Sequence, residues 1–177
     1  MTSSGWRRAT LALGSNQGDR MSMLQGAIDE LGRTGSVRIV AVSPVFETHP
    51  VGGPDQPDFL NAVVVAETLL SPRALLERAL DVELMFGRER IERWGPRTLD
   101  IDLLSMDDFV VDEPDLTLPH PRAHERPFVL VPWAALDPGA AVPGRGPVGV
   151  LADAVDRRGV RARPDLELHL PTEDGQQ

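Results

Sequence analysis

The sequence predicts an α+β fold, in which an antiparallel sheet carries helices on one face. Four segments have the β-branched or alternating composition of strands: residues 10–13, 37–48, 59–68 and 98–103. Apolar residues at helical spacing separate the first strand from the second and the third from the fourth. The resulting order, strand, helix, strand, strand, helix, strand, is that of a ferredoxin-like βαββαβ core.

The two helices between these strands have recognisable ends. The apolar stripe of the first is Met21, Leu24, Ile28 and Leu31. Asp19 is suited to cap its N-terminus and Gly32 to end it. The second helix begins at Ser71-Pro72, with proline in the first helical position, and ends at Gly87. Its stripe is Leu75, Ala79, Val82 and Phe86.

The C-terminal part adds smaller elements to this core. Residues 109–112 and 116–118 are predicted to form a hairpin, and residues 129–136 and 148–155 two further helices. No internal repeat or linker divides the chain. We therefore expect a single domain over residues 1–177, with its core at about residues 10–160 and with frayed ends.

Composition excludes several classes of function. The net charge of -9 argues against a duplex nucleic acid partner, since such proteins bind phosphates through an excess of basic residues. Every basic residue is arginine and cysteine is absent, which excludes Schiff-base lysines, a P-loop and thiolate sites. The N-terminus lacks the apolar run of a signal peptide, and no segment is long enough to span a membrane. We expect a cytoplasmic protein, monomeric and without nucleic acid or membrane partners.

The chemistry is predicted to lie in residues 88–104, R-E-R-I-E-R-W-G-P-R-T-L-D-I-D-L-L. Asp100 and Asp102 are two positions apart on a predicted strand, so they point to the same side, about 6 to 7 Å apart along it. Paired carboxylates of this kind suit Mg²⁺. The guanidinium groups before them suit phosphate oxygens; they are Arg88, Arg90, Arg93 and Arg97.

Simpler explanations exist for each half of this pattern. Arginines after a helix often only complement the negative end of its dipole. Aspartates on an edge strand often only keep that strand soluble. The turn Trp94-Gly95-Pro96 joins the two groups closely, however, and their combination favours phosphoryl chemistry.

Two other regions carry candidate binding residues. Phe59 and Asn61 share one face of the strand over residues 59–68, where a flat heterocycle could stack on the ring and bond to the carboxamide. The alternative, slightly favoured from these residues alone, is that Phe59 belongs to the core and Asn61 caps the strand. The segment P-H-P-R-A-H-E-R-P-F contributes a second cationic group and another aromatic ring; its candidate residues are His120, Arg122, His124, Arg126 and Phe128.

Taken together, these motifs resemble a known enzyme family. The run R-W-G-P-R-T-L-D-I-D-L-L, with G-R-E-R and D-Q-P-D-F-L-N-A before it and L-P-H-P-R and R-P-F after it, is similar to the 6-hydroxymethyl-7,8-dihydropterin pyrophosphokinases of folate biosynthesis. The resemblance covers about residues 10–136. It implies a ferredoxin-like fold, ATP as donor, two Mg²⁺ ions, and transfer of pyrophosphate to the pterin hydroxymethyl group with release of AMP.

The resemblance also implies residue roles. Asp100 and Asp102 would hold the metals, and Arg88 and Arg97 would act in catalysis. The ATP-binding set would be Arg90, Arg93, Trp94, Arg97, His120 and Arg126. The pterin-binding set would be Thr48, His49, Val51, Phe59, Asn61 and Phe128. The chain departs from the common family pattern at His49, where proline is usual, at Phe59, where tyrosine is frequent, and at Pro121, where an aromatic can occur.

Two other functions fit parts of the pattern. An RNA-recognition domain has the same topology, but it needs aromatic and basic residues on its central strands, where this chain has two aspartates. A different metal-dependent nucleotidyl or glycosyl transferase fits the D-x-D pattern alone. The nucleotide product separates this second alternative from a pyrophosphokinase, which releases AMP.

Overall fold

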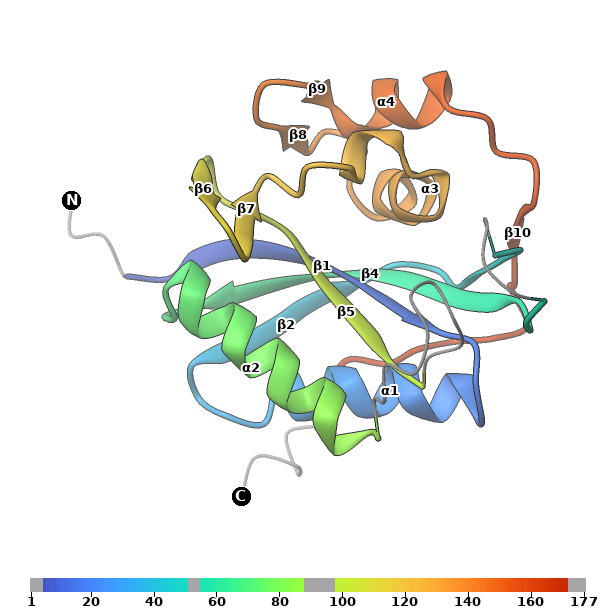
Figure 1. The fold of residues 1–177 in the computed structure, drawn as a ribbon, viewed down its shortest axis with the longest axis horizontal. Coiled ribbons are helices and arrows are strands. Elements are labelled where there is room, and N and C mark those ends of the chain that lie inside the picture. Colours follow the sequence, from blue (N-terminus) through green and yellow to red (C-terminus); the bar gives the residue numbers. More distant parts are fainter. Residues whose placement is uncertain (1–4, 51–54, 88–97, 172–177) are drawn as a thin grey trace.

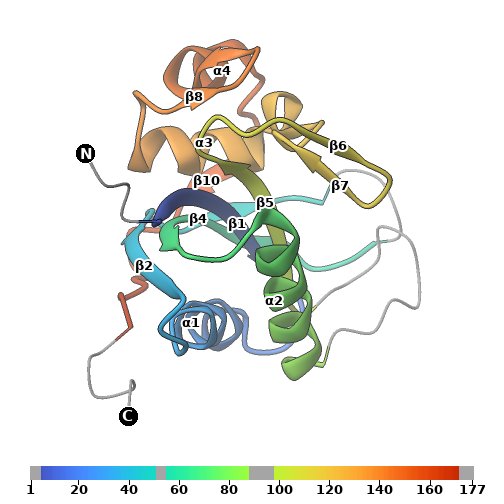
Figure 2. The ribbon, with the colours of Figure 1, turned by 90° about the vertical axis from the view of Figure 1, so that its left-hand side faces the viewer.

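The computed structural model describes residues 5–50, 55–87 and 98–171. In these residues an antiparallel sheet lies between two layers of helices (Figures 1 and 2). The predicted α+β class with an antiparallel sheet is confirmed. No helix in the described part of the chain has the length and apolar character needed to cross a membrane.

The sheet is built around its first strand. β1 (Arg7–Ser15) lies between β4 (Phe59–Thr68) and β5 (Asp100–Met106) and pairs antiparallel with both. The other edge of β4 pairs with two short strands, β2 (Val37–Val42) and β3 (Phe46–Thr48). A strand near the C-terminus, β10 (Val160–Ala162), then pairs with β3. The first and last parts of the chain thus meet in one sheet.

Helices cover both faces of this sheet, whereas the sequence predicted helices on one face. α1 (Arg20–Leu31) and α2 (Pro72–Met85) lie on one side, and α3 (Pro127–Leu136) and α4 (Val148–Ala154) lie on the other (Figures 1 and 2). The reason is that β4 is buried on both faces. Val64 packs in the cluster beneath α1 and α2, while its neighbour Val63 packs with α3 and α4.

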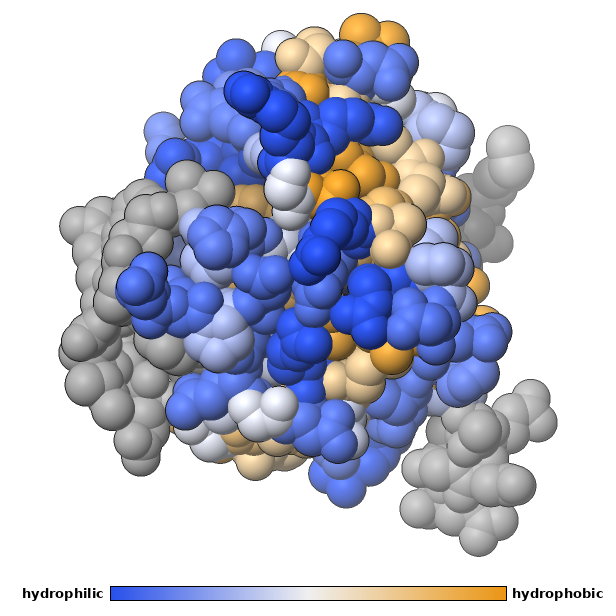
Figure 3. Space-filling model, turned by 90° about the vertical axis from the view of Figure 1, so that its right-hand side faces the viewer, coloured by the Kyte–Doolittle hydropathy of each residue, from blue (hydrophilic) through white to orange (hydrophobic). Residues whose placement is uncertain are grey.

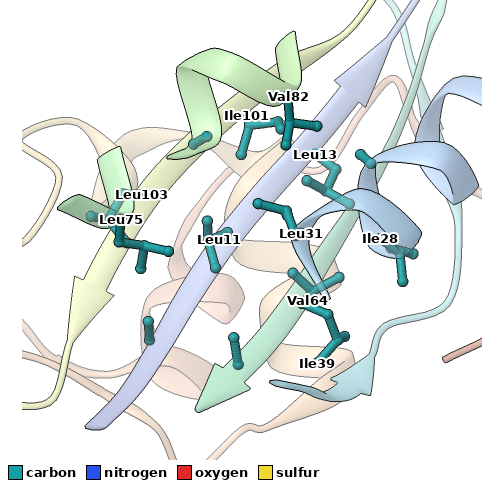
Figure 4. Packing of buried hydrophobic residues seen from close by; sticks show 14 of the residues in the cluster. Leu11, Leu13, Ile28, Leu31, Ile39, Val64, Leu75, Val82, Ile101 and Leu103 are labelled. Atoms are coloured by element: carbon teal, nitrogen blue, oxygen red, sulfur yellow. The ribbon is translucent and has the colours of Figure 1, made fainter. Parts of the chain in front are cut away.

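The larger apolar cluster lies between the sheet and the first two helices (Figure 4). Leu11, Leu31 and Leu75 are fully buried there. The predicted N-terminal caps are confirmed: the Asp19 side chain accepts a hydrogen bond from the Ser22 backbone N–H, and Ser71 caps α2 in the same way. Gly32 caps the end of α1 as predicted, whereas α2 ends at Met85, before the predicted Gly87. Capping and apolar spacing therefore fixed these two helices locally.

Several boundaries differ from prediction. Residues 37–48 form two strands, because Pro44 has no backbone N–H to donate to a neighbouring strand. β1 is longer than predicted, and the hairpin consists of β6 (Val111–Glu113) and β7 (Leu116–Leu118). The elements that were not predicted are too short to show periodicity: η1 (Ala123–Glu125), β8 (Ala141–Val142), β9 (Gly146–Pro147) and β10.

Candidate active site

The two aspartates of β5 lie on the face of the sheet that α3 covers. Ile101 and Leu103 point to the opposite side and belong to the core cluster beneath α1 and α2. Asp100 and Asp102 are half-buried, and the Asp102 side chain keeps 32% of its accessible surface. The carboxylates are therefore held on an ordered strand and remain partly accessible to solvent.

A buried acid on α2 holds the start of this strand. Glu83 is 1% exposed, and its Oε2 accepts a hydrogen bond from the backbone N–H of Ile101 at 3.0 Å. This contact fixes the strand directly after Asp100. Sequence reasoning missed Glu83, although its position four residues after Ala79, within the apolar stripe of α2, was a usable signal.

A cationic and an aromatic side chain at the N-terminus of α3 lie near Asp102. An Arg126 Nη1 lies 3.8 Å from Asp102 Oδ2. The Arg126 guanidinium also lies 5.6 Å from the centre of the Phe128 ring, within cation–π range. The structure thus brings together Asp102, Arg126 and Phe128, which the sequence placed in three separate sets.

His120 lies next to this group and is neutral at physiological pH. Burial, followed by the positive charge of Arg126, lowers the pKa of His120 to about 4, although Asp100 opposes the shift. The backbone N–H of Arg122 donates to His120 Nδ1 at 3.2 Å, and the backbone N–H of His120 donates to the carbonyl of Leu104 at 2.8 Å. With Nδ1 accepting, the neutral ring carries its proton on Nε2, where it can donate to an anionic oxygen.

A glycine separates the aspartates from the predicted pterin residues. On β1, Gly14 is paired with Asp100 on one side and with Asn61 on the other, so all three positions share a face. A Cβ atom at Gly14 would lie 3.1 Å from Asn61 Oδ1 and 3.7 Å from Phe59 Cδ1. Sequence reasoning did not single out Gly14, because its place between these residues depends on strand pairing.

Asn61 is buried and partly bonded. Its Nδ2 donates to Thr48 Oγ1 at 2.6 Å, and the residue is 7% exposed. Phe59 and Thr48 pair directly across β3 and β4. The His49 side chain lies elsewhere: it is 78% exposed and its Nδ1 lies 3.0 Å from Asp58 Oδ1. Of the predicted pterin residues, Thr48, Phe59 and Asn61 are therefore brought together on the strands.

Six predicted site residues lie outside the described part of the chain: Val51, Arg88, Arg90, Arg93, Trp94 and Arg97. A cavity of about 600 Å³ lies near the end of β1 and includes neither aspartate of β5 nor Asn61. Its lining residues are Asn16, Gln17, Gly18, Arg20, Glu47, Pro57 and Asp58.

The described residues contain no group of three or more histidine, cysteine, aspartate or glutamate side chains that could enclose a metal ion. Asp100 and Asp102 still fit Mg²⁺, because this ion is usually held by one or two carboxylates and completes its shell with water and substrate phosphates. The two carboxylates therefore suit a metal ion that is also coordinated by the phosphates of a bound ligand, rather than one coordinated by protein side chains alone.

Comparison with known proteins identifies the family. The model of 7,8-dihydro-6-hydroxymethylpterin-pyrophosphokinase (HPPK) matches residues 10–138. The chain belongs to the HPPK family. This confirms the resemblance seen in the G-P-R-T-L-D-I-D run and its flanking motifs, over almost the range predicted.

Individual relatives agree with this membership. The chain is 47% identical over 137 residues to the 2-amino-4-hydroxy-6-hydroxymethyldihydropteridine pyrophosphokinase of Methylorubrum extorquens, covering 77% of this chain and 87% of the relative. It is 41% identical over 179 residues to the enzyme of the same name from Mycobacterium tuberculosis, covering 92% and 93%.

Solved structures share the HPPK fold. The crystal structure of Plasmodium falciparum HPPK-DHPS with pterin and p-hydroxybenzoate aligns with a TM-score of 0.66 at 15% identity. The alignment covers 84% of this chain and 41% of the Plasmodium chain. At this identity the likeness concerns the fold alone.

Proposed function

We propose that the chain transfers pyrophosphate from ATP to the hydroxymethyl group of 6-hydroxymethyl-7,8-dihydropterin, releasing AMP, at the face of the sheet that carries Asp100 and Asp102. Membership of the HPPK family supports the reaction. The observation that supports its location is the row Asp100, Gly14 and Asn61 across β5, β1 and β4. Adjacent strands are about 4.8 Å apart, so this row separates a metal site from a ring-binding site by roughly 10 Å.

The fold proposed for this reaction is the ferredoxin-like βαββαβ core. The antiparallel strand order β2, β4, β1, β5, with α1 and α2 on one face, supports it. In this arrangement the first and last core strands, β1 and β5, lie side by side. Gly14 and Asp100, more than eighty residues apart in the chain, are neighbours for that reason.

Asp100 and Asp102 are proposed to hold two Mg²⁺ ions together with the phosphates of ATP. When bound, the ions would supply neutralisation of the phosphate charge. The protein contributes two fixed carboxylates on a strand anchored by Glu83. Because phosphoryl transfer depends mainly on positioning and charge neutralisation, the site needs no protein nucleophile.

The triphosphate is proposed to contact Arg126 and His120, together with Arg90, Arg93, Trp94 and Arg97. The 3.8 Å separation of Arg126 and Asp102 is a loose ion pair, so the guanidinium is free to exchange this partner for a phosphate oxygen. Because His120 is neutral, it can donate a hydrogen bond from Nε2 to a phosphate oxygen without bringing a positive charge into the site. Arg88 and Arg97 are proposed to stabilise charge that develops during the transfer.

The pterin is proposed to stack between Phe59 and Phe128, with Asn61, Val51 and the backbone of Thr48 and His49 around its edge. Because the Asn61 Nδ2 donates to Thr48, the Oδ1 atom is held as an acceptor towards Gly14. An acceptor in this position suits the N–H groups of a pterin ring. The chain is further proposed to act as a cytoplasmic monomer.

Product analysis tests the reaction. The purified chain would be incubated with ATP, Mg²⁺ and 6-hydroxymethyl-7,8-dihydropterin, and the nucleotides separated by chromatography. We expect AMP and the pterin diphosphate in equal amounts. Formation of ADP would contradict pyrophosphate transfer and would indicate another class of metal-dependent transferase. Omission of the pterin is the control for ATP hydrolysis.

A further inference from the structure

A C-terminal arginine lies behind the proposed pterin site. Arg161 belongs to β10, outside residues 10–138 that match the HPPK family. β10 pairs with β3 so that Val160 lies opposite Thr48 and Arg161 opposite Glu47. The backbone N–H of His49 also donates to the carbonyl of Gly159 at 3.3 Å. The C-terminal segment thus forms the outer neighbour of the strand that carries Thr48.

The Arg161 side chain joins two strands. Its Nη2 donates to Glu47 Oε1 at 2.7 Å and to Asp58 Oδ2 at 3.1 Å. Glu47 immediately precedes Thr48, and Asp58 immediately precedes Phe59. One guanidinium therefore ties the end of β3 to the start of β4, at the positions next to the proposed pterin contacts.

The Glu47 carboxylate is well suited to this anchoring role. Its side chain is 11% exposed, and it also accepts a hydrogen bond from Arg20 Nη1 at 2.7 Å and lies 3.2 Å from Arg163 Nη1. Burial alone raises the pKa of Glu47, but Arg20, Arg163 and Arg161 outweigh this effect and lower it. An ionised, largely buried carboxylate with several arginine partners holds its strand more firmly than an exposed pair does.

We propose that Arg161 is a positioning residue for pterin binding, acting through Glu47 and Asp58 on the Thr48–Asn61 hydrogen bond. The inference rests on the pterin site proposed above. Arg20 makes a second such link, since its Nη1 donates to Glu47 Oε2 and to the backbone carbonyl of Asp58. Loss of Arg161 therefore leaves β3 paired with β4 but loosens their alignment, on which the 2.6 Å bond that orients the Asn61 carboxamide depends. Asp100 and Asp102 lie on β5, beyond β1, so the effect on ATP is small.

The surface at this end of the molecule is mostly hydrophilic, with hydrophobic atoms visible between the polar groups (Figure 3). The Arg161 side chain is 63% exposed, so solvent weakens each of its ion pairs. The expected effect is accordingly a change in affinity and not a loss of folding.

The test compares Arg161→Gln with a control on the same segment. Arg158→Gln removes a guanidinium that pairs locally with Asp156. Isothermal titration would measure the dissociation constants of ATP and, with a non-hydrolysable ATP analogue bound, of the pterin substrate. For Arg161→Gln we expect pterin affinity to fall about fivefold and ATP affinity to change less than about twofold. Arg161→Lys, which keeps the charge, is expected to recover part of the loss, and Arg158→Gln to match the unmodified chain.

Equal losses for both substrates, or no loss of pterin affinity, would overturn the positioning role. Asn61→Ala separates this result from failure of the site itself. If Asn61→Ala weakens pterin binding and Arg161→Gln does not, only the positioning role is wrong. If neither variant weakens it, the proposed pterin site is wrong and the inference falls with it. Should Arg161→Gln not fold, Asp58→Asn removes one of the two contacts and is expected to weaken pterin binding in the same direction.

Discussion

The two faces of the central sheet differ in what their residues do. Along β5, Ile101 and Leu103 pack in the core beneath α1 and α2, while Asp100 and Asp102, one position away, face the other side. On that other side the sheet is apolar where α3 and α4 cover it, as at Val63 and Leu104. It is polar at the neighbouring positions of the proposed site, as at Asn61. One face serves packing alone, and the other combines packing with the polar residues of the proposed site.

This difference shows how a small domain separates folding from chemistry. Adjacent residues on a strand point to opposite faces, so a site residue can be exchanged without opening the core. We therefore expect substitutions on the core face to lower stability, and substitutions of site residues on the other face to lower turnover or substrate affinity. Four experiments test or sharpen this separation, and they are given from the largest expected effect to the smallest.

Removal of a carboxylate should give the largest effect. For Asp100→Ala or Asp102→Ala we expect turnover to fall by about a thousandfold or more, because phosphate charge is no longer held at the strand. The thermal midpoint should stay close to that of the unmodified chain. Asp108→Ala, at an exposed position beyond the end of β5, is the matched control and should retain activity. Near-normal turnover in either site variant would refute the metal assignment.

Truncation on the core face should show the opposite pattern. Leu11 is fully buried at the centre of the sheet, and Leu11→Ala should lower the free energy of unfolding by about 2 to 5 kcal/mol. Chemical denaturation measures this loss. Turnover per folded molecule should be retained at low temperature. A selective loss of pterin affinity in this variant would mean that the two faces are coupled.

A methyl group on the floor of the site should weaken pterin binding. In Gly14→Ala the new Cβ would lie 3.1 Å from Asn61 Oδ1, closer than most such contacts, so the carboxamide must move. We expect pterin affinity to fall about tenfold, equivalent to about 1.4 kcal/mol, with little change in stability. Gly35→Ala is the control, since a Cβ there would have no neighbour within 4 Å. Unchanged pterin binding in Gly14→Ala would place the ring elsewhere.

The smallest expected effect concerns His120 and pH. Its pKa is about 4 in the folded chain, below the ordinary value of 6.5, because burial and Arg126 disfavour the charged ring. The unfolded chain therefore binds a proton first as the pH falls, and stability is lost between about pH 6.5 and 4. Between pH 7.5 and 5 in metal-free buffer, the unmodified chain should lose about 1 kcal/mol more unfolding free energy than His120→Gln, a modest amount because the ring is partly open to solvent. Parallel pH profiles for the two proteins would contradict the shift.

Much of the fold and part of the site could be predicted from the sequence, because the signals are local. Alternation placed Asp100 and Asp102 on one side of a strand, and Asp19 and Ser71 capped the helices as predicted. Long motifs such as G-P-R-T-L-D-I-D identified the family. Each of these features depends on residues close together in the chain.

Only the tertiary structure decided which distant residues meet. Gly14 lies between Asp100 and Asn61 because β1 takes the central place between β4 and β5. α3 and α4 cover the second face of the sheet, which brings Arg126 to within 3.8 Å of Asp102. Arg161 contacts Glu47 across a separation of 114 residues. The period of a strand or helix sets which way a side chain points, but strand order and pairing register set what it faces.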